Sequence, residues 1–355
     1  MTVPFQRQAG KRKRTSKARF LGLYSTLYLI TGLLLSCSAN NSTGAINNPD
    51  ESDNMEETGS MQNYLTTNSF VRDIVNHSAF AGFGELLLPH DDNSAYYNTR
   101  LSNVGSLMPY HGHVVPEDVV GALNRMIDDT NNGKTIFYDF YSEDQKRSTP
   151  SKKNTGLFFF RGDPGAPFTI ICPGGGFSYV GSLHEGIPLA KAASEKGYNA
   201  FVIRYRIGGN QLATEDLAAA ISFVFKNAEK LGVDTANYCL IGGSAGARMV
   251  GDIALNGVAA YGVDRFAKPA TAVIAYTGQS TYSSGFSPSF IVQAANDGIV
   301  NINTVETRVA NLRRYGVEVE YKRYETAGHG FGLGTGSEAQ GWLDLAIDFW
   351  KRHIN

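Results

Sequence analysis

The sequence predicts an α/β fold in which a mostly parallel central sheet is covered by helices on both faces. From about residue 64 onward, short apolar segments typical of buried strands alternate with segments of helical periodicity. Strands that are joined through helices pair in parallel, and such sheets are buried on both sides. The chain has 355 residues, of which 42% are hydrophobic and 18% charged, so it can bury a core of this size.

Eight segments have the composition expected of strands, and the first two also show period-2 alternation with aromatic residues. In chain order they are Thr135–Tyr141, Gly156–Arg161, Phe168–Cys172, Asn199–Tyr205, Tyr238–Ile241, Thr271–Tyr276, Phe290–Ala294 and Val317–Tyr324.

Helical patterns precede, separate and follow these segments. The clearest covers Glu215–Leu231, where apolar residues recur at spacings of three and four; Thr214 is expected to cap its start and Gly232 to end it. A closing helix is predicted at Ala339–His353. Pro116–Asp129 is predicted to be a helix within an N-terminal extension, residues 63–132, which we expect to pack on the α/β domain formed by 133–355.

The first 36 residues have the pattern of an export signal. Residues 1–19 contain seven basic residues and no acid, and an uncharged apolar run, Phe20–Ser36, follows. Leu34–Cys37 resembles the lipobox of bacterial lipoproteins, which predicts lipidation of Cys37 and a membrane-tethered protein in the periplasm or at the cell surface. The alternative is an uncleaved helical anchor, which would also export and tether the chain.

Composition limits the other roles of the chain. Residues 37–62 are acidic and nearly free of large apolar residues, which predicts a disordered tether. The formal net charge of −1 argues against nucleic acid as a partner, because binding to phosphates needs a basic surface. Three cysteines are too few for a disulfide scaffold or a cysteine-rich zinc site.

Gly242-Gly243-Ser244-Ala245-Gly246 is the strongest chemical signal. It matches the Gly-x-Ser-x-Gly pattern, directly after an apolar strand and directly before the helical segment Arg248–Leu255. This is the context of a nucleophile elbow, a strained turn that exposes a serine hydroxyl and requires small neighbours. The alternative is a glycine-rich strand-to-helix turn that binds phosphate.

A second glycine-rich segment, Cys172–Phe177, follows another apolar strand. Its glycines let backbone amides approach a ligand closely, so the amides of Gly175 and Gly176, with that of Ala245, are candidates for an oxyanion hole. No Lys-Ser or Lys-Thr pair follows these glycines, which excludes a Walker phosphate loop.

A serine nucleophile needs a base, and the base needs an acid that orients it. His329 follows the last predicted strand, and Asp297 follows the strand before it. The order Ser244, Asp297, His329 is the order in α/β hydrolases, and each residue is placed at the carboxyl end of a strand, where ligands bind in such sheets. His353 lies at the end of the chain and Asp344 lies within the closing helix, so both are rejected.

The chain from about Thr135 to Asn355 resembles the α/β-hydrolase esterases that include acetylxylan and feruloyl esterases. The segments that carry the resemblance are Cys172–Arg206, which includes Gly197–Arg206, then Glu215–Ile221, Gly243–Gly246 and Gly328–Phe331. Pro173 stands where related esterases have a histidine, and Gly298 follows Asp297 where proline or aspartate is common. The resemblance implies an α/β-hydrolase fold and a short acyl group on a carbohydrate as the substrate.

Other polar residues have less specific signals. Tyr179, His184 and Glu185 follow the glycine-rich segment, and Thr277 follows a strand; all four are candidates to line the substrate pocket, although His184 and Glu185 could equally start a helix. His111 and His113 invite a zinc interpretation, but no third ligand is evident nearby, so an exposed loop or a pocket wall is preferred.

Cys172 and Cys239 lie in apolar runs, which favours buried free thiols over a disulfide bridge.

Together these features predict an exported serine esterase that needs no metal or cofactor and forms an acyl-enzyme. A peptidase of the prolyl-oligopeptidase type is one rival, although 63–132 leaves no room for the large β domain usual in such enzymes. A surface binding protein on an inactive hydrolase scaffold is the other. The sequence leaves the oligomeric state open.

Overall fold

The structure is a computed structural model and describes residues 63–354. The predicted leader (1–36), the tether (37–62) and the lipidation of Cys37 lie outside the described residues. Within them, one eight-stranded sheet has the order β1-β2-β4-β3-β5-β6-β7-β8. The strands are β1 Phe137–Tyr138, β2 Gly156–Phe160, β3 Pro167–Cys172, β4 Asn199–Arg204, β5 Asp234–Gly243, β6 Thr271–Ala275, β7 Ser289–Ala294 and β8 Val319–Tyr324.

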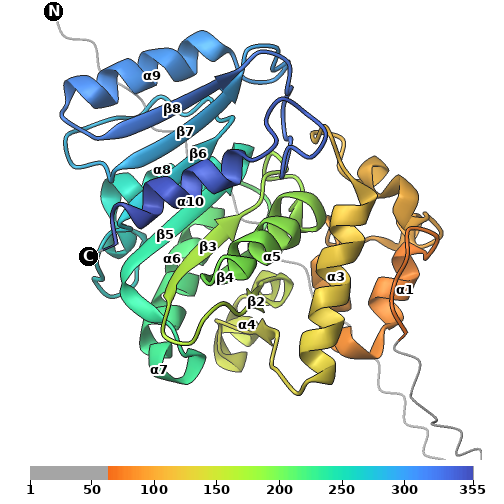
Figure 1. The fold of residues 1–355 in the computed structure, drawn as a ribbon. Helices are drawn as coiled ribbons and strands as arrows, with labels where there is room; N and C mark the ends of the chain where they lie inside the picture. The colour runs from red at the N-terminus through yellow and green to blue at the C-terminus, as the bar shows by residue number, and fades with distance from the viewer. Residues whose placement is uncertain (1–62, 355) are drawn as a thin grey trace, which may run out of the picture. The chain divides into compact units, whose positions relative to one another are not determined.

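Strands β3 to β8 pair in parallel, and only β1–β2 and β2–β4 are antiparallel pairs within the described sheet. Helices cover both faces (Figure 1). They are α1 Val71–Asn76, α2 Gly84–Leu87, α3 Pro116–Asn131, α4 Glu143–Ser148, α5 Ile187–Glu195, α6 Asn210–Lys226, α7 Ala228–Leu231, α8 Ser244–Asn256, α9 Ile302–Arg314 and α10 Trp342–Lys351. The predicted fold class is confirmed.

The apolar strands are buried on both sides because their side chains alternate between two clusters. In β3, Ile171 belongs to the cluster that contains residues of α3, α5 and α10, whereas Ile170 belongs to the cluster with residues of α6, α8 and α9. A strand of this kind must be apolar throughout, which is why the central strands show continuous apolar runs.

The segment predicted as one helix, Glu215–Leu231, forms two helices, and the first of them begins five residues earlier than predicted. Helix α6 begins at Asn210, so Thr214 lies inside it and donates its hydroxyl to the Asn210 carbonyl instead of capping. The helix is interrupted at Asn227, whose side chain donates to the Phe223 carbonyl at 2.8 Å. Such side-chain bonds compete with helix continuation. Helix α7 then ends at Gly232 with φ +69°, as predicted.

Two other elements are shorter than predicted. Only Phe137–Tyr138 of the opening segment pairs in the sheet, because Tyr141 lies apart from the strand and donates its hydroxyl to the buried Asp216 at 2.7 Å. The closing helix begins at Trp342 and not at residue 339, since Gly341 precedes it in the left-handed conformation at φ +84°.

The segment 63–132 contributes its own layer of apolar side chains. Leu123 and Ile127 of α3 belong to the same buried cluster as Leu189 of α5, and the two helices lie side by side (Figure 1). The loop before α3 reaches the carboxyl edge of the sheet, where the Gly112 amide donates to the His329 carbonyl at 3.0 Å.

Candidate active site

Ser244 lies at a sharp turn between β5 and α8, as the elbow motif predicts. Its φ is +50°, a conformation that costs energy for any residue with a side chain. A Cβ atom on Gly246 would lie 1.8 Å from the carbonyl oxygen of Cys172, and one on Gly242 would lie 2.6 Å from the Ala247 nitrogen. Gly246 is therefore needed because the turn packs directly against the end of β3, and Gly242 because the backbone of the turn folds back against it.

The structure brings Ser244, His329 and Asp297 together from three separate parts of the chain. The Ser244 hydroxyl donates to His329 Nε2 at 2.9 Å, and His329 Nδ1 donates to Asp297 Oδ2 at 2.7 Å. The side chains of His329 and Asp297 are 6% and 0% exposed. This continuous chain of hydrogen bonds has the geometry by which a histidine activates a serine hydroxyl.

Asp297 is held as a carboxylate in a buried position. Burial alone would raise its pKa, but the hydrogen bond from His329 and the amides of Val300 and Ile299 outweigh it, so the pKa lies below its ordinary value. The two amides donate to Oδ1 at 2.8 and 2.7 Å, and Gln293 Nε2 donates to Oδ2 at 2.9 Å. The carboxylate thus keeps a fixed orientation toward the imidazole.

The glycine-rich segment lies directly over the elbow. A Cβ atom on Gly174 would be 2.9 Å from Ser244 Cβ, and Gly175 and Gly176 adopt φ of +131° and +62°. Within residues 63–354, the amides of Gly175 and Gly176 have no hydrogen-bond acceptor. The Ala245 amide belongs to the first turn of α8, where helical amides have no intrahelical acceptor. Three unpaired amide donors are thus carried by the glycine-rich segment and the start of α8, which pack against each other at Ser244.

Ser244 opens into a pocket of about 290 Å³. Thr277 is the only one of the predicted substrate-lining residues that lines this pocket. Two of the predicted oxyanion donors, Gly176 and Ala245, also line it, whereas Gly175 does not. The remaining lining residues are Phe177, Ser244, Arg248, Tyr276, Gly278, Gln279 and Val300.

Backbone strain is concentrated at this pocket. Among the described residues, four that are not glycine have positive φ, and Phe177, Ser244 and Tyr276 are three of them. All three line the pocket. Such conformations persist where the surrounding structure enforces them, as it commonly does at functional sites.

The predicted substrate-lining role of Glu185 is corrected by its position behind the pocket. Glu185 is 2% exposed, and its Oε2 accepts from the Gly174 amide at 2.6 Å. His111 Nε2 lies 3.2 Å from Glu185 Oε1, with both side chains 1% exposed. Burial opposes the charge on Glu185, but the nearby His111 outweighs it and lowers the pKa of the carboxyl. Glu185 therefore supports the glycine-rich segment from behind.

Tyr179 and His184 are also buried and do not reach the pocket. The Tyr179 hydroxyl accepts from the Tyr110 amide at 2.9 Å and lies 2.8 Å from His111 Nδ1. His184 Nε2 donates to the Gly330 carbonyl at 2.9 Å, and burial lowers the pKa of His184 to about 4. Their side chains are turned into the layer between the 63–132 segment and the sheet because they satisfy buried backbone groups there.

His111 therefore does not lie in an exposed loop, because its side chain is 1% exposed and faces Glu185. Its partner His113 in the sequence pattern is exposed and has φ of +53°. The part of the chain that the structure describes contains no group of three or more His, Cys, Asp or Glu side chains arranged to hold a metal. No signal in the sequence would pair His111 with Glu185, because the two residues are far apart along the chain.

The two residues that the sequence rejects as acid and base lie outside the site. Asp344 pairs with Lys196 on the surface, and His353 bonds the Phe349 carbonyl, both away from Ser244. Cys172 and Cys239 are buried free thiols on the adjacent strands β3 and β5.

Among residues 63–354, no helix is long and apolar enough to span a membrane.

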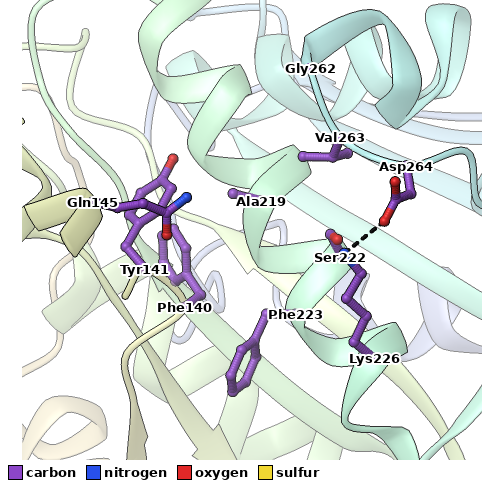
Figure 2. A pocket seen from close by; sticks show the side chains of 10 residues that line it. All are labelled: Phe140, Tyr141, Gln145, Ala219, Ser222, Phe223, Lys226, Gly262, Val263 and Asp264. Carbon is purple, nitrogen blue, oxygen red and sulfur yellow. Dashed lines mark ion pairs between the residues drawn. The ribbon is translucent and has the colours of Figure 1, made fainter. Parts of the chain in front are cut away.

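A hollow of about 550 Å³ lies elsewhere, against α6 (Figure 2). Phe140 and Tyr141 lie on one side of it, and an ion pair of 2.7 Å between Lys226 and Asp264 lies on the other. Ser222 also lines this hollow, but its hydroxyl has no hydrogen-bond partner among the described residues, and Lys226 is paired with Asp264. In contrast to Ser244, this serine is therefore not hydrogen-bonded to a base.

Comparisons with known proteins agree with the fold. Residues 161–261 match the BD-FAE family model. A stretch of 93 residues is 32% identical to endo-1,4-beta-xylanase B of Butyrivibrio fibrisolvens; it covers 24% of this chain and only 14% of that protein.

Two solved structures have the same fold. An esterase of Thermogutta terrifontis is similar with a TM-score of 0.52 and 19% identity, covering 61% of this chain and 93% of that one. A putative carboxylesterase of Lactobacillus plantarum has a TM-score of 0.50 and 22% identity, covering 57% and 94%. The fold is that of the α/β hydrolases, and the resemblance to α/β-hydrolase esterases stands.

Proposed function

We propose that this protein is a serine carboxylic-ester hydrolase that works through an acyl-enzyme. The observation that carries the proposal is the chain of hydrogen bonds from Ser244 through His329 to Asp297, with distances of 2.9 and 2.7 Å. A hydrolase of this type needs a strained serine, an oriented base and free amide donors at one edge of the sheet. All of these occur together at this site.

In the first half of the reaction, Ser244 Oγ attacks the ester carbonyl while His329 Nε2 takes the hydroxyl proton. Asp297 accepts the hydrogen bond from His329 Nδ1 and stabilises the positive charge of the imidazolium. The amides of Ala245 and Gly176, which both line the pocket, donate to the oxyanion, a contribution of about 3 kcal/mol per donor in other serine hydrolases. His329 then gives its proton to the leaving alcohol.

In the second half, His329 takes a proton from water, whose oxygen attacks the acyl carbon. The tetrahedral intermediate collapses, the proton returns to Ser244, and the carboxylic acid leaves. Each step uses groups that the chain itself supplies.

We further propose that the substrate is a short acyl group, such as acetyl, on a carbohydrate. The pocket volume of about 290 Å³ is just below the usual range for ligand sites, roughly 300 to 1,000 Å³, which favours a small acyl group. The Thermogutta terrifontis esterase was solved with propionate bound, and the sequence relative is a xylanase. Export and tethering through a lipidated Cys37 would give the enzyme access to polymeric carbohydrate outside the cell.

The decisive experiment measures labelling by a fluorophosphonate and turnover of 4-nitrophenyl acetate. Ser244→Ala should abolish both, because the nucleophile is lost, whereas Ser102→Ala, an exposed serine far from the site in sequence, should retain both. A wild-type protein that neither labels nor hydrolyses the ester would instead support a binding protein. Acetylated, feruloylated and longer-chain esters, with a proline-containing peptide, would then define the acyl group and test the peptidase alternative.

A further inference from the structure

Arg248 is the one charged side chain among the residues that line the described pocket beside Ser244. It lies on α8 four residues after Ser244, and both residues line the same pocket. Arg248 is exposed, and no acidic side chain lines the pocket with it.

Arg248 has no partner within residues 63–354. Its natural partner would be Asp252, which lies four residues further along α8. The Asp252 carboxylate is occupied elsewhere: Oδ1 accepts from Gln279 Nε2 at 2.6 Å, and Oδ2 accepts from Asn210 Nδ2 at 2.6 Å. Arg248 therefore lines the pocket as an exposed residue that forms no ion pair with an acidic side chain among residues 63–354.

On the side of the pocket that α8 forms, two features favour a negatively charged group. The amino end of α8 carries a partial positive charge at Ala245, and the guanidinium adds a full charge on the same side. A guanidinium binds a carboxylate through two parallel hydrogen bonds, which are stronger than bonds between neutral groups. A carboxylate on a bound ester would thus be held within one helical turn of the nucleophile.

We propose that Arg248 forms an anion subsite and that the enzyme prefers esters that carry a carboxylate. The inference rests on the proposed function and specifies its substrate class. The carboxylate can belong to the acyl part, as in a half ester of a dicarboxylic acid, or to the alcohol part, as in an acetylated acidic sugar. Both present the same chemistry to Arg248, and the experiment distinguishes them.

The experiment compares kcat/KM for matched charged and neutral esters. For the acyl part, the 4-nitrophenyl half ester of glutaric acid is compared with 4-nitrophenyl valerate. For the alcohol part, acetylated methyl glucuronide is compared with acetylated methyl glucoside. The variants are Arg248→Gln, which removes the charge, and Arg248→Lys, which keeps it. Arg265→Gln is the control, because Arg265 is exposed, unpaired within 63–354 and absent from the pocket lining.

In one of the two arms, Arg248→Gln should lower the ratio of charged to neutral kcat/KM about tenfold, and Arg248→Lys should preserve most of it. High salt should reduce the wild-type ratio, since the subsite is exposed. Arg265→Gln should leave the ratio unchanged. If Arg248→Gln leaves both ratios unchanged while the neutral esters are still cleaved, the anion subsite is wrong and the esterase proposal survives. If the wild-type protein cleaves none of the four esters, the proposed function itself fails.

Discussion

At the scale of single residues, the site depends on side chains that are held in costly states. Ser244 has a positive φ of +50°, and Asp297 is charged although its side chain is 0% exposed. An isolated peptide would favour neither the left-handed backbone of Ser244 nor a carboxylate shielded from water at Asp297. The surrounding hydrogen bonds compensate for the burial of Asp297, and the packed glycines enforce the turn at Ser244.

The lowered pKa of Asp297 predicts a specific dependence of stability on pH. Because its folded-state pKa lies below the ordinary 3.8, Asp297 stabilises the fold above pH 3.8, and this contribution is lost as the pH falls toward the folded-state pKa. Asp297→Asn should therefore be less stable than the wild type at pH 7, and the difference should shrink below pH 3.8.

Urea unfolding at pH 7, 5, 4 and 3 would measure this difference. Asp344→Asn is the control, since Asp344 is a half-exposed carboxylate that pairs with Lys196 on the surface. A constant difference between the wild type and Asp297→Asn across this range would contradict the prediction.

At the scale of elements, the close packing of β3, β5 and α8 determines where small residues are required. Gly246 has no room for a Cβ atom, because the Cys172 carbonyl oxygen would lie 1.8 Å away. Gly121, inside α3, has open space where a Cβ atom would stand, with no atom within 4 Å. The two glycines are both helical, but only the first is fixed by tertiary contact.

These two positions predict opposite effects of the same substitution. Gly246→Ala should destabilise the fold by about 3 kcal/mol or more, because backbone atoms must move apart. Gly121→Ala should stabilise it by about 0.5–1 kcal/mol, because alanine favours a helix. Denaturant unfolding measures both, and a Gly246→Ala variant as stable as the wild type would show that the turn can relax.

At the scale of the whole described molecule, the 63–132 segment is joined to the oxyanion side of the site. His111 of this segment faces Glu185 at 3.2 Å, and Glu185 in turn binds the Gly174 amide at 2.6 Å. The pair therefore connects a loop that precedes α3 to the glycine-rich segment above Ser244. The two side chains are buried against each other, so removing either one leaves the other without its partner, and the two residues should act as a unit.

Glu185→Gln and His111→Asn should each lower kcat about 10- to 100-fold with a smaller change in KM, because the oxyanion donors shift. The affinity for a boronic acid that forms a tetrahedral adduct with Ser244 should fall in parallel, which a loss of stability alone would not produce.

The double variant tests whether the two residues act as a unit. The factor by which the double variant lowers kcat should be smaller than the product of the two single factors, because either substitution alone already disrupts the pair. Glu229→Gln, an exposed carboxylate on α7, is the control. If the double variant lowers kcat by the full product of the two single factors, the two residues act independently and the prediction is wrong.

The sequence by itself determined the sheet and the order of chemistry along the chain. Continuous apolar runs specify strands buried on both sides, and a strained serine turn specifies its glycines; both are local requirements that a single segment can record. The predictions for Ser244, Asp297 and His329 named the three residues that the structure joins by hydrogen bonds.

Only the tertiary structure decided what surrounds that core of the site. Glu185 and Tyr179 follow the glycine-rich segment in sequence, so proximity suggested the pocket, but their side chains pack behind it because the 63–132 segment brings His111 there. Arg248 and Gln279 line the pocket without any motif. Contacts between residues that are distant in sequence depend on how layers pack, and a single sequence does not record that packing.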